Sequence, residues 1–143
     1  MDLSVTYLGM QLAHPLMPGA SPMADTMDGV RRLEDAGASA VVLRSLFEEQ
    51  IVREQLGAGE HIHGYESAHP EARSYLPPTT VFARGSDAYL EHLHRVRTAV
   101  SVPVIASLNG VTPGGWIRYA RRMQEAGAHA LEINLYAVPT DPD

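Results

Sequence analysis

Four polar residues stand at the ends of two apolar segments in the last third of the chain. Ser107 and Asn109 follow an apolar run that begins at Val104, and Asn134 and Tyr136 close a second run. Hydroxyl and amide groups donate and accept hydrogen bonds, and a phenol can also give up a proton. The sequence therefore predicts a ligand site wherever the ends of these two segments meet.

The two segments fit a strand–helix–strand unit. Val104–Ala106 is short and apolar, as in a strand of a parallel sheet, and Ala130–Leu135 alternates with a period of two. Between them, Thr112 before a proline predicts a helix over 113–126, which Gly127 ends. Crossovers of this kind place polar residues at the carboxyl ends of parallel strands, where α/β proteins build their sites.

An internal repeat extends this unit to the rest of the chain. Residues 31–41 recur as residues 121–131, and each copy has a helix end, a glycine stop, a small-residue turn and a buried strand. Such repeats build a (β/α)₈ barrel or a doubly wound sheet. Polar strand ends and an amino-terminal hairpin favour the barrel. The predicted fold class is α/β: the N-terminal half of a (β/α)₈ TIM barrel with an N-terminal β-hairpin plug.

The predicted domain is one partial TIM barrel over residues 1–143. Residues 1–16 form the hairpin, and residues 17–143 form roughly four βα units. A long stretch at 58–85 shows no sustained period. Loops of this length are typical of lids and binding loops, so we expect a lid over the site.

The first two predicted strands also end in residues suited to a site. A strand at Leu16-Met17 leads to Ala20 and Ser21, whose small size lets a ligand approach the backbone. A helix capped by Thr26 and ended by Gly37 follows.

The second strand is buried and ends in a cation. Ala40–Leu43 is apolar and leads to Arg44 and Ser45. Arg44 either neutralises a ligand or pairs with Glu48 or Glu49. Ser45 and Glu48 match a capping box, which predicts that a helix begins there.

Composition narrows the classes of function. The chain has 143 residues, no cysteine and a net charge of −6 without runs of like charge. No segment is long and apolar enough to span a membrane, and no signal sequence is visible. We therefore expect a cytoplasmic protein with a small-molecule substrate and with neither a nucleic-acid nor a membrane partner.

Histidines are the remaining candidates for metal ligands. His61, His63 and His69 lie in the long loop, but no helix or strand holds them and no cysteine assists, so we predict no metal site. His92 and His94 stand two apart on a predicted helix that begins at Ser86, and we expect both at the surface.

These segments, taken in order, resemble the FMN-dependent class 1 dihydroorotate dehydrogenases and their dihydroorotate dehydrogenase-like relatives. The resemblance covers nearly the whole chain. The matching motifs are Tyr7-Leu8-Gly9, Ala20-Ser21-Pro22, Arg44-Ser45, Ser107 with Asn109-Gly110, and Glu132-Ile133-Asn134-Leu135.

The resemblance implies FMN as cofactor and an oxidoreductase that acts on a CH–CH bond of a small carbonyl-bearing substrate, in chemistry related to pyrimidine biosynthesis. It also implies which residues bind FMN: Ala20, Ser21, Arg44, Ser45, Ser107 and Asn134. A different role for Asn134 is to hold the loop after its strand.

Two departures from the family limit what the resemblance implies. The cysteine base of the family is replaced by Ala137, so the catalytic base is unassigned. Tyr136, the neighbouring proton-bearing side chain, either acts as an acid or packs. A Leu-Pro-Asn motif that holds orotate in the family has no counterpart in the long loop, so dihydroorotate itself is not implied as the substrate.

The chain is also about half as long as the family barrel. It therefore resembles an N-terminal half, inactive by itself, that either lacks a C-terminal half or closes a barrel as a homo-oligomer. An alternative function is a non-catalytic half-barrel that self-associates. A flavin-free phosphate-binding barrel shares the strand pattern but does not account for Arg44 or for Glu132 and Asn134.

Overall fold

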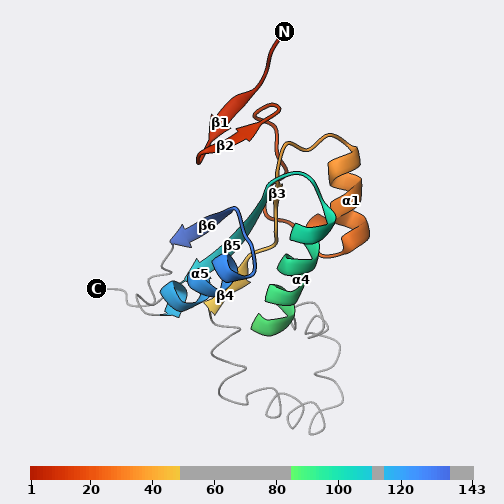
Figure 1. The fold of residues 1–143 in the computed structure, drawn as a ribbon. Helices are drawn as coiled ribbons and strands as arrows, with labels where there is room; N and C mark the ends of the chain where they lie inside the picture. Colours follow the sequence, from red (N-terminus) through yellow and green to blue (C-terminus); the bar gives the residue numbers. More distant parts are fainter. Residues whose placement is uncertain (49–84, 111–114, 136–143) are drawn as a thin grey trace, which may run out of the picture.

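A computed structural model of the chain describes residues 1–48, 85–110 and 115–135. It is a mixed α/β structure in which helices cover one face of a parallel sheet, and a separate β-hairpin lies near the start of the strands (Figure 1). The predicted α/β class is confirmed.

The hairpin is formed by β1 (Val5–Tyr7) and β2 (Met10–Leu12), which pair antiparallel. Leu8 and Gly9 connect them with φ angles of 50° and 78°. Positive φ at both central residues is the geometry of the turn that matches the twist of a two-stranded ribbon. The hairpin is shorter than the predicted range of 1–16.

Within the described residues the main sheet has four strand segments, all parallel, with β5 in the centre. The segments are β3 (Val41–Val42), β4 (Leu46–Phe47), β5 (Val104–Gly110) and β6 (Ala130–Leu135). β6 pairs with β5 from Ile105 to Gly110, so β3 and β4 must both lie on the other side of β5.

β3 and β4 are therefore two parts of one interrupted strand. Val42 lies opposite Ile105, and Leu46 lies opposite Leu108. Three residues, 43–45, thus face the two residues 106–107, which is the residue count of a β-bulge. The bulge contains Arg44 and Ser45.

The helices begin and end largely as the sequence predicts. They are η1 (Pro22–Ala24), α1 (Met27–Asp35), α4 (Ser86–Ala99) and α5 (Gly115–Glu125). The Thr26 hydroxyl accepts from Gly29 N at 3.1 Å, which confirms the predicted cap. Gly37 and Gly127 end their helices with φ angles of 88° and 100°. Thr112 and Pro113 lie outside the described residues.

Two hydrophobic clusters lie on opposite faces of the sheet. On one face, α4 and α5 cover Val104, Ala106 and Leu108 of β5 with buried residues that include Leu93 and Met123. At about 25 cal/mol for each Å² of apolar surface removed from water, this burial is the main stabilising contribution of the domain.

On the other face, Leu12 of the hairpin packs with Ala40, Val42 and Ile105, at the amino-terminal end of β3 and β5. The hairpin therefore covers the beginning of the sheet face that the helices leave open. Further along the same face the side chains of β5 and β6 are polar.

The predicted strand at Leu16-Met17 is wrong, because these residues are not part of a strand. The Leu16 carbonyl instead accepts from Ser39 N and Ser39 Oγ, at 3.2 and 2.6 Å. The segment thus lies beside the start of β3 without pairing along it.

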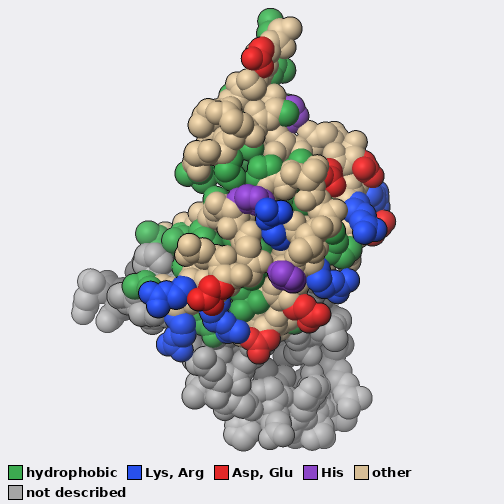
Figure 2. Space-filling model, in the orientation of Figure 1, with side chains coloured by type: hydrophobic (Ala, Val, Ile, Leu, Met, Phe, Trp, Pro, Cys, Tyr) green, Lys and Arg blue, Asp and Glu red, His purple; other side chains and the backbone are tan. Residues whose placement is uncertain are grey.

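The surface of the helices is charged in both signs. Figure 2 shows acidic and basic side chains next to one another on the face in view. Arg122 of α5 donates to Asp87 of α4 at 2.6 Å. No helix in the described ranges has the length and apolar character needed to cross a membrane.

Candidate functional site

A cluster of polar side chains meets around the Ser107 hydroxyl on β5. Ser107 Oγ lies 2.7 Å from Ser45 Oγ and 2.6 Å from Glu132 Oε1. Asn134 Nδ2 lies 3.4 Å from both Ser107 Oγ and Glu132 Oε1. The bulge and two neighbouring strands thus bring together three of the residues predicted to bind a cofactor, together with Glu132.

The direction of each hydrogen bond follows from the carboxylate. An ionised Glu132 only accepts, so Ser107 donates to it. Ser107 Oγ must then accept from Ser45 Oγ, and the Asn134 amide nitrogen points towards the same two oxygens. A hydroxyl has one proton and two lone pairs, so Ser107 has used its full capacity. Ser107 is fully buried and forms the base of the cluster.

Tyr89 of α4 fills the gap that the bulge leaves in the sheet. Its hydroxyl accepts from Ser107 N at 3.1 Å and donates to the Ser107 carbonyl at 3.3 Å. These two backbone groups face the bulge, where ladder bonds are missing. Burial raises the pKa of the Tyr89 phenol, so it stays neutral and keeps its proton to donate.

Asn109 lies two residues further along the same face of β5. It is level with Asn134 of β6 and Phe47 of β4 in the strand register. Asn109 is 7% exposed, and its Oδ1 is buried with no hydrogen-bond partner among the described residues. An unpaired buried carbonyl costs about 1–3 kcal/mol of stability, so this oxygen is a candidate acceptor for a hydrogen bond from a ligand.

Arg44, the other bulge residue, points to a different neighbour. Its Nη1 donates to Asp25 Oδ2 at 2.9 Å, and both side chains are about one-third exposed (35% and 27%). The sequence suggested Glu48 or Glu49 as the partner of Arg44; the structure pairs it with Asp25, and Glu49 lies outside the described residues. Asp25 follows η1, so this ion pair connects the bulge to the start of α1.

The helix predicted to begin at the Ser45 capping box begins later in the chain. Leu46 and Phe47 still pair with β5, and the chain becomes helical at Glu48. The pairing and burial of Leu46 outweigh the local capping signal. Ser45 consequently contributes its hydroxyl to the cluster rather than to a helix end.

The remaining predicted residues are less informative. Ala20 is exposed, and the Ser21 carbonyl accepts from Ala24 N in η1 at 3.3 Å; neither has a hydrogen bond to the cluster within the described segments. Tyr136, Ala137 and His61, His63 and His69 lie outside the described residues. No group of three metal-ligating side chains occurs in the parts of the chain that the structure describes.

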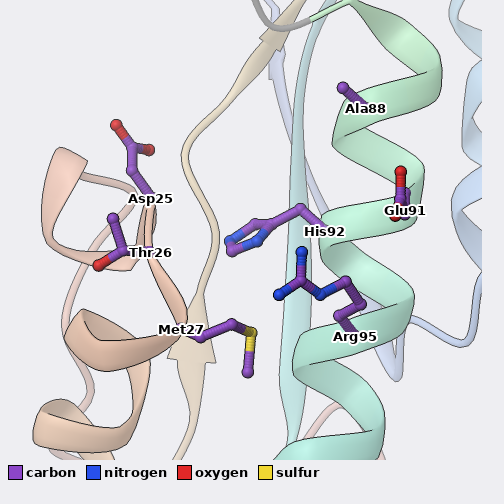
Figure 3. A pocket seen from close by; sticks show the side chains of 7 residues that line it. All are labelled: Asp25, Thr26, Met27, Ala88, Glu91, His92 and Arg95. Atoms are coloured by element: carbon purple, nitrogen blue, oxygen red, sulfur yellow. The ribbon is translucent and has the colours of Figure 1, made fainter.

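A separate cavity of about 370 Å³ lies between the start of α1 and α4 (Figure 3). It is lined by Asp25, Thr26, Met27, Ala88, Glu91, His92 and Arg95. His92 was expected at the surface, and this expectation is wrong: it is half-buried, and its Nε2 lies 2.8 Å from the Ala24 carbonyl. No residue of the strand-end cluster lines this cavity, so we place the candidate site at the strand ends.

The cluster could have been found from sequence only in part. Glu132 and Asn134 follow the period-two pattern that puts them on one face of their strand, and Ser107 is the polar residue after the neighbouring apolar run. No sequence pattern points to Tyr89. Its hydroxyl bonds to backbone groups of Ser107 that the bulge leaves without strand partners, and the bulge is visible only from the strand pairing.

Comparison with known proteins gives one distant relative. The chain is 26% identical over 136 residues to a protein of Aeropyrum pernix named "Putative dihydroorotate dehydrogenase A (fumarate)". The match covers 94% of this chain and 41% of the relative, so the chain spans less than half of the relative's length. No protein-family model matches the chain.

Proposed function

We propose that this chain is the flavin-binding N-terminal part of an FMN-dependent oxidoreductase similar to dihydroorotate dehydrogenases. The similarity to the Aeropyrum pernix protein supports the family. The observation that carries the proposal is the polar cluster at the carboxyl ends of adjacent parallel strands, which is where barrel enzymes hold their ligands.

The residues present fit a flavin. An isoalloxazine ring offers carbonyls and a ring N–H along its pyrimidine edge, and the amides of Asn134 and Asn109 can bind such an edge. The unpaired buried Oδ1 of Asn109 requires a donor. An apolar row that includes Val42 and Ile105 lies towards the amino ends of the same strands and keeps water from the base of the site.

Each residue then has a distinct task. Asn134 contacts the ring, Ser107 and Glu132 fix the orientation of its amide, and Ser45 completes the hydroxyl chain. Arg44, held by Asp25, places positive charge near the strand ends. When bound, FMN would supply hydride transfer to or from one carbon of a substrate C–C bond, and the group that exchanges the accompanying proton is unassigned. We propose a small carbonyl-bearing substrate.

Flavin binding tests the proposal. The protein, expressed at the full length that its gene encodes, should carry flavin absorbance or quench FMN fluorescence when titrated. Asn134→Ala should weaken binding roughly tenfold, the effect of one lost hydrogen bond in a buried site. The matched control is Gln124→Ala on the exposed side of α5. A wild-type protein that binds no flavin would overturn the proposal.

A second candidate is a non-catalytic half-barrel that self-associates. The observation in its favour is β6, which pairs only with β5 among the described strands and exposes Ile133 and Leu135, at 39% and 69%. Open strand edges with apolar side chains pair readily with other chains. Sedimentation of the flavin-free protein tests this: a concentration-dependent dimer supports self-association, and a monomer at all concentrations rejects it.

A further inference from the structure

Helix α4 has a polar stripe whose role the strand-end cluster does not explain. The core face of α4 carries buried residues such as Leu93 and Val96. A second stripe lines the cavity of about 370 Å³ beside the start of α1 and consists of Ala88, Glu91, His92 and Arg95. Residues three and four apart share one face of a helix, so the stripe is a continuous wall of the cavity. Small-molecule pockets have volumes in this range.

Two opposite charges on this wall are not paired with each other. Glu91 and Arg95 stand four residues apart with the acid first, which is the spacing and order that favours an ion pair along a helix. Neither forms an ion pair with any residue that the structure describes. In Figure 3 the Arg95 guanidinium extends towards His92 and the start of α1. A free cation and a free anion therefore line the same cavity.

The other ionisable side chains of the cavity already have partners. Asp25 Oδ2 accepts from Arg44 at 2.9 Å, so the charge of this carboxylate is offset. His92 Nε2 lies 2.8 Å from the Ala24 carbonyl, and because a carbonyl only accepts, this nitrogen carries the proton. The full charges that remain for a ligand are one positive and one negative.

We propose that this cavity binds a small zwitterion of the α-amino acid type. The carboxylate of the ligand accepts two parallel hydrogen bonds from the Arg95 guanidinium, and its ammonium group pairs with Glu91. The Cβ atoms of residues four apart on a helix are about 5–6 Å from each other, so two charges separated by a single carbon can reach both side chains. Met27 and Ala88 supply apolar surface for a short aliphatic side chain.

This site goes beyond the proposed function. No residue of the strand-end cluster lines the cavity, and binding of a zwitterion there requires no flavin. The two proposals can therefore be tested on the same protein by separate measurements.

The test uses L-valine and two analogues that each lack one of its charges. Isovalerate has no ammonium group, and isobutylamine has no carboxylate. The NMR signals of the His92 ring report binding inside the cavity. L-Valine should shift these signals saturably, and each analogue should bind roughly fivefold more weakly, which is the upper effect of one partly exposed ion pair. L-Alanine serves as a second zwitterion with a smaller side chain.

Two variants assign the charges to their partners. Arg95→Gln should weaken L-valine binding roughly fivefold without weakening isobutylamine, which has no carboxylate to lose. Glu91→Gln should weaken L-valine by a similar factor without weakening isovalerate. Both replaced side chains are exposed, so the variants should keep the fold. Arg118→Gln and Glu125→Gln, at exposed positions of α5, are the matched controls.

Three results would each overturn this inference. They are a wild type that binds neither L-valine nor L-alanine, equal binding of L-valine and its two analogues, and unchanged L-valine affinity in either variant. None of them affects the flavin titration, so the proposed function would stand or fall separately.

Discussion

The two ends of one sheet face differ in chemistry although the same strands form both. At the amino-terminal end, Val42 and Ile105 are buried against Leu12 of the hairpin. At the carboxyl-terminal end, Ser107 and Glu132 form a hydrogen-bonded cluster with their neighbours. The difference teaches that apolar packing and the candidate ligand site are separated along the strands rather than between layers, which is the arrangement typical of barrel enzymes.

The largest expected effect comes from the apolar end. Ile105→Ala should lower the free energy of unfolding by about 2–5 kcal/mol, because it opens a cavity where Ile105 is 3% exposed. Urea denaturation measures this loss, with Ile117→Ala at a 60% exposed position as the control. At a temperature where the variant is still folded, FMN binding should be unchanged; a parallel loss of binding would mean that the two ends are not separate.

Tyr89 holds the polar end from the helical side, through the backbone of Ser107. Tyr89→Phe should cost about 1–3 kcal/mol, because the Ser107 N–H and carbonyl lose their shared partner while the ring still packs. Tyr7→Phe on the half-exposed hairpin is the control. Equal urea midpoints for Tyr89→Phe and wild type would show that the phenol does not bridge the bulge.

The same phenol predicts an alkaline dependence. Its pKa is raised by burial in the folded state, so the unfolded state loses the proton first. The stability that Tyr89 contributes is complete below the unfolded pKa of about 10 and declines as the pH rises beyond it. Urea midpoints between pH 8 and about 11 should fall more steeply in the wild type than in Tyr89→Phe; parallel curves would contradict this.

The polar end should matter less for stability. Ser107→Ala should cost about 1–2 kcal/mol, because Glu132 and Ser45 lose a hydrogen bond but stay near other polar groups. Its effect on FMN affinity should exceed that of Ser4→Ala on the exposed amino-terminal arm. If Ser107→Ala destabilised the protein as much as Ile105→Ala does, the polar end would be a structural core and the comparison would fail.

The smallest effect is expected at His129, just before β6. Its Nδ1 accepts from Val104 N at 2.9 Å, and burial and then Arg97 lower its pKa. A lowered pKa favours the neutral form, so this stability is present above pH 6.5 and is lost as the pH falls through the folded pKa. His129→Asn keeps an acceptor without a titrating group, and its urea midpoint should vary less between pH 7 and about 5.

The sequence predicted elements better than contacts. Caps and stops such as Thr26 and Gly127 are local signals, and they were correct. The capping box at Ser45 was a local signal too, but pairing of the following strand with β5 overrode it. The strand predicted at Val104–Ala106 was expected to be short, yet pairing with β6 extends it to Gly110. Long-range pairing decided each of these cases, and no local pattern reports it.

The site shows the same limit. The positions of Ser107 and Asn134 at the carboxyl ends of two predicted strands indicated that they meet, and the structure brings them within 3.4 Å. The sequence did not predict that Arg44 turns to Asp25 while the adjacent Ser45 turns to Ser107. That divergence requires the extra residue of the bulge, which appears only when the registers of β3 and β4 are compared.

The bulge also makes the site depend on the number of residues between β3 and β4. Deleting one residue between Leu43 and Leu46 would restore an unbroken ladder and leave no room for the phenol of Tyr89. It would also turn one of the two side chains, Arg44 or Ser45, to the opposite face. In related sequences, a one-residue gap at this point should therefore mark a change of ligand more reliably than most substitutions nearby.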